Sequence, residues 1–193
     1  MSRFTRAILV LTVVSSCAFG QQWINDWISK TSPAGQVGAD TLVSFLNAEL
    51  RTIIGKKTPE FPFWESRTDS VQTLADYRGS VVIVNFWGLH CSGCRNEMPA
   101  LSELDSIYSE KGMRVLFLSS DPKDKIASFF ASKKFHGVCA RLLRVDLQRP
   151  YQMLAMPSSF IVDAKGIIRD AWMGPLNFED WEAKITPYLQ ASK

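Results

Sequence analysis

Residues 81–99 read VVIVNFWGLHCSGCRNEMP and combine a strand, a loop with two cysteines and the start of a helix. Residues 81–86 form a nearly continuous β-branched and apolar run, which is typical of a buried central strand. Cys91 and Cys94 follow in C-x-x-C spacing, and a helical pattern extends over about 94–111. Because catalytic groups of such sheets gather outside the carboxyl ends of the parallel strands, this loop is the expected place of the chemistry.

Strand-like and helix-like patterns alternate along the rest of the chain. Further elements are expected at 114–119 (strand), from Asp121-Pro122 through Phe130 (helix), 142–145 (strand), 159–162 with 167–172 (a hairpin) and 178–189 (helix). This order predicts an α/β fold, with a mixed central sheet and helices on both of its faces. The first crossover should join two parallel strands in a right-handed sense.

The composition is that of a soluble globular domain. The 193 residues are 46% hydrophobic and 21% charged, which argues against disorder and against a polytopic membrane protein. The formal net charge is +3, and Arg3 and Arg6 in the first twenty residues supply part of it. The remaining chain has too little excess charge for a nucleic-acid partner, so none is expected.

Residues 1–20 have the layout of a bacterial export signal, with a basic start, a short apolar run and small residues. One cleavage site would lie before Gln21, and a lipobox ending at Cys17 is the alternative, with a retained short anchor as a third possibility. Either cut predicts a periplasmic or cell-envelope protein, in a compartment where disulfides persist. Contact with the membrane is expected only if Cys17 is lipidated.

Residues 21–54 are expected to form a helical N-terminal extension before a domain at 55–193. Trp23 and Trp27 share one face of a first helix, and Asp40 caps a second helix that Gly55 stops. The second helix has an apolar stripe at Leu42, Phe45, Leu46, Leu50, Ile53 and Ile54. Such a stripe needs covering, by the main domain or by a second copy; docking to a partner or a membrane is the alternative.

Two thiols two residues apart at a helix start can close a small disulfide ring with little backbone movement. The positive end of the helix dipole stabilises a thiolate at Cys91, the outer sulfur. Cys91 is therefore the expected nucleophile toward a substrate disulfide, and Cys94 the resolving thiol. Structural zinc sites share the spacing but need a second pair of ligands, which the sequence lacks. The chemistry requires no metal, nucleotide or flavin, because the electrons travel on sulfur.

The stretch 81–99 resembles the active-site region of bacterial exported thioredoxin-like proteins of the TlpA/ResA type. GKKTPEF at 55–61 resembles the entry segment of that family, and MPSSFIVD at 156–163 resembles its second landmark. The resemblance covers 55–193 and implies a thioredoxin-like fold with thiol–disulfide oxidoreductase activity. It further implies a reductase of protein disulfides, supplied by a membrane electron donor, with cytochrome c maturation as one setting.

The resemblance also implies roles for individual residues. A cis Pro157 would place the Met156 backbone beside Cys91, ready to pair with an extended substrate strand. Trp87 would cover one side of the cysteine pair, or else pack in the core. Glu97 matches an acidic position of the family and would relay protons to the inner thiol, or else be a solvated charge on the helix.

Three positions depart from the family pattern. His90 stands where a Trp usually precedes the first cysteine, and a cationic imidazole there would stabilise the Cys91 thiolate, unless it points to solvent. Ser92 and Gly93 lack the proline that often stiffens this loop. Asn85 replaces the buried acid of cytoplasmic thioredoxins.

Two other classes of function remain open at this stage. The first is a copper-binding metallochaperone that uses Cys91, Cys94 and His90. The second is a thiol peroxidase, although Gly88 occupies the place of the polar neighbour that this chemistry usually needs. The odd cysteine, Cys139, is expected to be a buried small side chain. The substrate, the donor and the direction of electron flow are not encoded in these motifs.

Overall fold

A computed structural model describes residue 44 and residues 47–143, 151 and 155–190 of the chain. It contains two compact units, Met1–Ser44 and Phe45–Lys193. The expected export signal, the lipobox at Cys17 and the first helix of the extension lie outside the described residues. The second unit contains every element discussed below.

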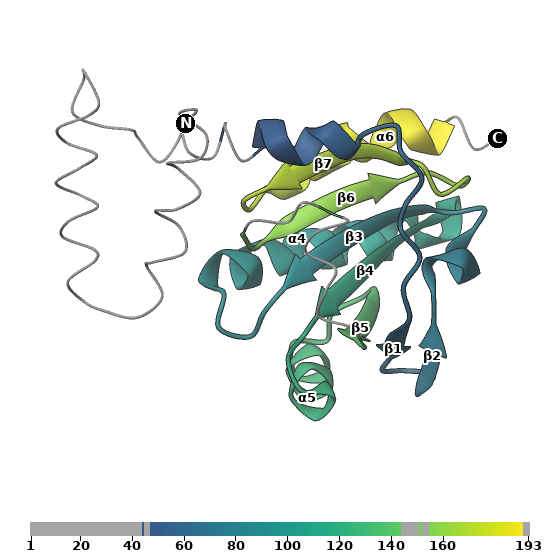
Figure 1. Cartoon of the computed structure of the whole chain (residues 1–193). Helices are drawn as coiled ribbons and strands as arrows, with labels where there is room; N and C mark the ends of the chain where they lie inside the picture. Colours follow the sequence, from purple (N-terminus) through teal and green to yellow (C-terminus); the bar gives the residue numbers. More distant parts are fainter. Residues whose placement is uncertain (1–43, 45–46, 144–150, 152–154, 191–193) are drawn as a thin grey trace, which may run out of the picture. The chain divides into compact units, whose positions relative to one another are not determined.

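The second unit is built on a seven-stranded mixed sheet in the order β2-β1-β5-β4-β3-β6-β7 (Figure 1). Its strands are β1 Phe63–Glu65, β2 Ser70–Gln72, β3 Val81–Trp87, β4 Met113–Ser119, β5 Val138–Leu142, β6 Ser158–Val162 and β7 Ile168–Met173. The central strand β3 is parallel to β4, as expected for the first crossover, and antiparallel to β6. The hairpin of β6 and β7 is also confirmed.

Helices lie on both faces of the sheet, with the three α-helices on one face and short helical turns on the other. They are α4 Ser92–Tyr108, α5 Lys123–Lys133 and α6 Phe178–Gln190, with the short 3-10 helices η1 Arg51–Ile53, η2 Leu74–Tyr77 and η3 Ser109–Lys111. Side chains alternate along β3, so Val81 and Ile83 face a core shared with α4, α5 and α6. Val82 and Val84 face a second core that η1 and η2 help to close.

The strand expected at 142–145 is wrong in position. Strand β5 covers Val138–Leu142, and Leu143, directly after it, is exposed. It begins after Gly137, whose backbone has φ of +101° and on which an added Cβ would come within 2.8 Å of the Phe117 ring. Pairing with β4 on one side and β1 on the other holds this strand, and local composition does not signal such pairing.

The end of the N-terminal extension packs on the main sheet. Residues 47–50 are helical and lead into η1, where Leu50 and Ile53 are buried in the core. The Asn47 side chain accepts a hydrogen bond from the Met173 backbone N–H at 2.7 Å and donates to its carbonyl at 3.3 Å. This part of the expected apolar stripe is therefore covered by the chain's own domain. Within the described residues, the helices are too short or too polar to span a bilayer.

Candidate active site

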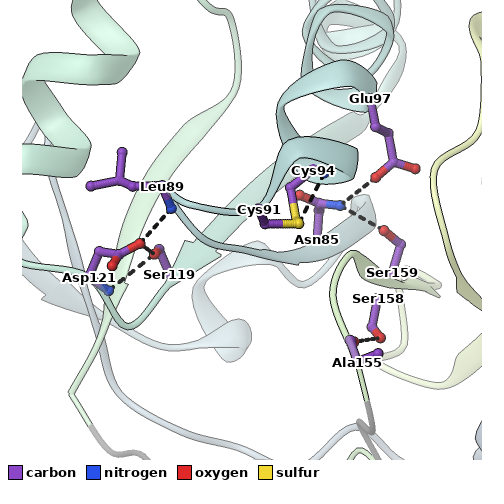
Figure 2. The surroundings of a disulfide bond; sticks show 10 residues. All are labelled: Asn85, Leu89, Cys91, Cys94, Glu97, Ser119, Asp121, Ala155, Ser158 and Ser159. Atoms are coloured by element: carbon purple, nitrogen blue, oxygen red, sulfur yellow. Dashed lines mark hydrogen bonds between the residues drawn. A yellow bond between two sulfur atoms is a disulfide. The ribbon is translucent and has the colours of Figure 1, made fainter. Parts of the chain in front are cut away.

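The cysteine pair lies where the chain leaves β3 and enters α4 (Figure 2). Helix α4 begins at Ser92, two residues earlier than the sequence pattern suggested, and Cys91 is its N-cap. Cys91 is joined to Cys94 by a disulfide. The Cys94 backbone N–H donates to the Cys91 sulfur at 3.1 Å. A tight turn precedes the pair, because the Cys91 N–H donates to the Gly88 carbonyl at 3.1 Å.

The two sulfurs differ in their access to solvent. Cys91 is half-buried, whereas Cys94 is 1% exposed and belongs to the core beneath α4. The free N–H groups of the first helical turn and the helix dipole favour negative charge at the N-cap sulfur. The arrangement suits attack by the outer sulfur and resolution by the inner one.

Glu97 follows Cys94 by three residues and is buried, so it is not a solvated charge on the helix. Its Oε1 accepts hydrogen bonds from the Leu176 backbone N–H at 3.1 Å and from the Trp181 indole N–H at 3.0 Å. Burial raises the pKa of Glu97 to about 7, and the hydrogen bonds to the carboxylate oppose that rise. A carboxyl group that titrates near neutral pH can both accept and return a proton.

Asn85 connects Glu97 to the strand next to β3. Its Nδ2 donates to Glu97 Oε2 at 3.1 Å and to Ser159 Oγ at 2.9 Å. Its Oδ1 is buried and has no hydrogen-bond partner among the described residues. Trp181 and Ser159 thus belong to the surroundings of the site. Ser159 lies within the landmark at 156–163, whereas no local sequence signal indicated Trp181, which is 84 residues from Glu97 in the chain.

Trp87 and His90 occupy contrasting positions. Trp87 is buried, with its ring centroid 5.5 Å from that of Phe129. This favours its core-packing role, since a substrate would not reach the indole in this form of the protein. His90 is exposed at the rim of the loop.

The second landmark of the sequence meets the cysteine loop in space. The Met156–Pro157 peptide bond is cis, Met156 is 50% exposed, and Pro157 is buried. A Cβ added to Gly93 would lie 3.5 Å from Pro157 Cδ, and one added to Gly88 would lie 3.6 Å from Met156 Cε. The structure therefore brings Met156 and Pro157 against the segment that carries Cys91 and Cys94.

An acid that the sequence analysis did not single out also reaches this loop. Asp121 Oδ2 accepts a hydrogen bond from the Leu89 backbone N–H at 2.7 Å and from Ser119 Oγ at 3.0 Å. Figure 2 shows this group on one side of the disulfide, with Asn85 and Glu97 on the other. A signal was available, since Ser119 ends the strand parallel to β3 and Asp121 follows it, at the same sheet edge.

Cys139 is free and buried in β5, as expected. Burial raises the pKa of its thiol to about 11, so it stays protonated at neutral pH. Among the described residues, no group of three or more His, Cys, Asp or Glu side chains is arranged to hold a metal ion.

A disulfide-bonded C-x-x-C pair at the start of the helix after a central strand, with a buried carboxyl three residues further on, is typical of a thiol–disulfide oxidoreductase with a thioredoxin-like fold. Comparison with known proteins leads to the same class. A model of the AhpC/TSA family matches residues 54–171, and the chain belongs to that family.

Known relatives and solved structures indicate which kind of thiol–disulfide oxidoreductase this chain is similar to. The thiol-disulfide oxidoreductase ResA of Bacillus cereus is 28% identical over 158 residues, which cover 80% of this chain and 91% of ResA. The crystal structure of a Chlorobium tepidum protein named as thiol:disulfide interchange protein DsbE has a TM-score of 0.65 at 28% identity. The match covers 70% of this chain and 97% of that one. The predicted resemblance to ResA-type proteins is thereby confirmed.

The fold is shared more widely. The thioredoxin domain of a Bacteroides vulgatus thiol-disulfide oxidoreductase has a TM-score of 0.62 at 22% identity, over 70% of this chain and 97% of that domain. The expected thioredoxin-like fold is confirmed by this likeness and by the mixed sheet.

Proposed function

We propose that this protein is exported and reduces disulfides in other proteins, with Cys91 as the nucleophile and Cys94 as the resolving thiol. The observation that carries the proposal is the half-buried Cys91 at the N-cap of α4, joined to a buried Cys94 with Glu97 three residues further on. The ResA and DsbE relatives are named for thiol–disulfide oxidoreduction and interchange, which supports the exchange chemistry.

The first step is attack by the Cys91 thiolate on one sulfur of a substrate disulfide. A bond forms between Cys91 and that sulfur, the substrate disulfide breaks, and the second substrate sulfur leaves as a thiolate and takes up a proton. Exposed Met156 lies beside the loop, where its backbone would align an extended substrate strand.

The second step needs a base near the inner thiol, because a buried thiol is a poor nucleophile. Glu97, with a pKa of about 7, takes the Cys94 proton, and the Cys94 sulfur attacks Cys91. The mixed disulfide breaks and the substrate leaves with both of its sulfurs reduced. The protein then holds the Cys91–Cys94 disulfide, and a membrane dithiol donor returns two electrons and two protons.

For the substrate class, we propose exported proteins that must keep paired thiols reduced, such as apocytochromes c before haem attachment. A C-x-x-C-H pair oxidised prematurely would have to be reduced again before haem could be attached. Export at residues 1–20, with lipidation at Cys17 as one variant, would place the protein in that compartment.

The decisive experiment replaces each cysteine in turn. Cys94→Ser should trap a covalent complex with the substrate that is cleaved by reductant, because resolution is blocked while attack is not. Cys91→Ser is the matched control and should trap none. If Cys91→Ser trapped the substrate equally well, the assignment of the nucleophile would be wrong.

The direction of electron flow is tested by the equilibrium reduction potential of the pair, read by thiol trapping across dithiol buffers. A value near the thioredoxin end of the range, about −270 mV, is expected for a reductase. A value near about −120 mV would mark a disulfide donor instead and overturn the reductase assignment.

A further inference from the structure

We propose that Asp121 is a positioning residue of the reactive loop, whose carboxylate holds the Leu89 backbone N–H and so fixes the turn that presents Cys91. The hydrogen bond from Leu89 N to Asp121 Oδ2 is 2.7 Å long. This distance lies at the short end of the usual range for a hydrogen bond between an N–H group and an oxygen.

The topology of the sheet places this acid opposite the loop. Strands β3 and β4 are parallel neighbours, and Trp87 is paired with Ser119 at their carboxyl ends. Leu89 lies two residues beyond the first strand, and Asp121 lies two residues beyond the second. The two loops therefore emerge side by side, and the short aspartate side chain spans the gap between them (Figure 2).

Asp121 is itself held in place before it binds the loop. Its Oδ2 accepts a bond from Ser119 Oγ at 3.0 Å, and its backbone N–H donates to that same hydroxyl at 3.1 Å. The Arg141 Nε donates to the Asp121 carbonyl at 3.2 Å. An anchor that is fixed in this way loses little further freedom when it orients its partner.

The segment that Asp121 holds is the turn from Gly88 to Cys91. The Cys91 N–H closes this turn onto the Gly88 carbonyl, and Leu89 lies inside it. A Cβ added to Gly88 would lie 3.6 Å from both Asp121 Oδ2 and Met156 Cε, so the carboxylate and the landmark methionine border the same residue. Fixing Leu89 thus fixes the approach of Cys91 toward a substrate held at Met156.

The consequence for catalysis rests on the proposed function, because the orientation of Cys91 affects rate only if Cys91 is the attacking sulfur. The claim that Asp121 fixes the Leu89 backbone does not depend on the proposed function. Two readouts therefore separate the two claims: amide hydrogen exchange at Leu89 in the oxidised protein, and the rate at which the reduced protein reduces a protein disulfide.

Three variants make the test. Asp121→Ala removes the acceptor and the charge, whereas Asp121→Asn removes the charge and keeps a carbonyl oxygen for the Leu89 N–H. Asp124→Ala is the matched control, since that acid lies three residues away, is 71% exposed, and pairs with Lys125 at 4.0 Å.

In the oxidised protein we expect Asp121→Ala to speed exchange of the Leu89 amide about tenfold, equivalent to about 1.4 kcal/mol, while Asp124→Ala changes nothing. Asp121→Asn should restore most of the protection. In the reduced protein, Asp121→Ala should slow disulfide reduction several-fold and Asp121→Asn should recover most of the rate.

Unchanged protection of Leu89 in Asp121→Ala would overturn the proposal. Equal behaviour of the Ala and Asn variants in both readouts would also overturn it, because the charge and not the bond would then be responsible. If Leu89 loses protection as expected but Cys94→Ser traps no substrate, the positioning role stands and the proposed function fails.

Discussion

At the scale of single residues, the pKa values of the titratable groups depend on how far each group is buried away from water. Glu97 is buried next to the disulfide, and burial raises its pKa to about 7. Cys139 is buried in the same layer of the core, and burial raises its pKa to about 11. The same cause makes one group responsive near neutral pH and keeps the other inert.

The raised pKa of Glu97 makes stability depend on pH. The folded state holds the Glu97 proton between the ordinary value of 4.5 and about 7, so its contribution is present at low pH and is lost as pH rises through about 7. Glu97→Gln has no proton to lose. Relative to it, the oxidised wild type should lose on the order of 3 kcal/mol of unfolding free energy between pH 4.5 and 7.5. Urea unfolding across that range measures this.

A control for this pH series is Glu103→Gln, since Glu103 is an exposed acid on the same helix. Its stability should follow that of the wild type at every pH. If Glu97→Gln also followed the wild type, the carboxyl would have the same pKa in the folded and unfolded states. It would then be too weak a base near neutral pH for the proposed transfer from Cys94.

The inertness of Cys139 can be checked by labelling. In the reduced, folded protein at pH 8, iodoacetamide should modify Cys91 and leave Cys139 unlabelled, because the latter is buried and its pKa is about 11. Peptide mass analysis reads the sites. Cys139→Ala should leave the rate of disulfide reduction unchanged, and a loss of activity would instead reveal a redox role for this thiol.

At the scale of elements, the short helical segment before the sheet is anchored to it by buried side chains and by hydrogen bonds. Leu50 and Ile53 close the core on the face opposite α4, and Asn47 bonds twice to the end of β7. Gly55 ends the segment with a left-handed backbone, φ of +85°, which a glycine adopts at little cost.

Truncating this segment's core contact should therefore be costly. Leu50→Ala is expected to lower the unfolding free energy by about 2–5 kcal/mol, because it leaves a cavity in a closed core. Ile54→Ala, four residues on and 36% exposed, should cost well under about 1 kcal/mol. Chemical denaturation measures both. Similar small losses in the two variants would mean that this segment does not pack on the sheet in solution.

At the scale of the whole molecule, the sheet separates two hydrophobic cores, and only one of them contacts the cysteine pair. The core beneath α4 contains Cys94, Trp87 and Met98, and therefore supports the site. The opposite core contains Phe63 and Tyr151 and does not include the cysteine pair. The site should consequently tolerate damage to the far core better than damage to its own.

Two variants test this separation. Phe63→Ala should lower the unfolding free energy by about 3–5 kcal/mol while the folded protein keeps its reduction potential. Met98→Ala, which opens the core directly beside Glu97, should lower stability and also shift the potential. Thiol trapping combined with denaturation reads both quantities. A shift in potential for Phe63→Ala as large as that for Met98→Ala would show that the two cores are coupled.

The sequence by itself determined the fold class and the position of the chemistry. The run at 81–86, the C-x-x-C pair and the landmark at Met156 are local patterns, and their spacing carries the information directly. The parallel crossover and the final hairpin followed from the order of the patterns.

Tertiary structure alone decided the remainder. Strand β5 is held by partners on both sides, so a short run with few β-branched residues did not reveal its bounds. From the sequence, Glu97 could be a proton relay or a solvated helix charge. The structure excludes the solvated charge, because Glu97 is buried and accepts hydrogen bonds from Trp181 and Leu176. Asp121 acts across two strand ends. Burial and hydrogen bonding between distant segments are properties of the packed chain, and a local pattern does not contain them.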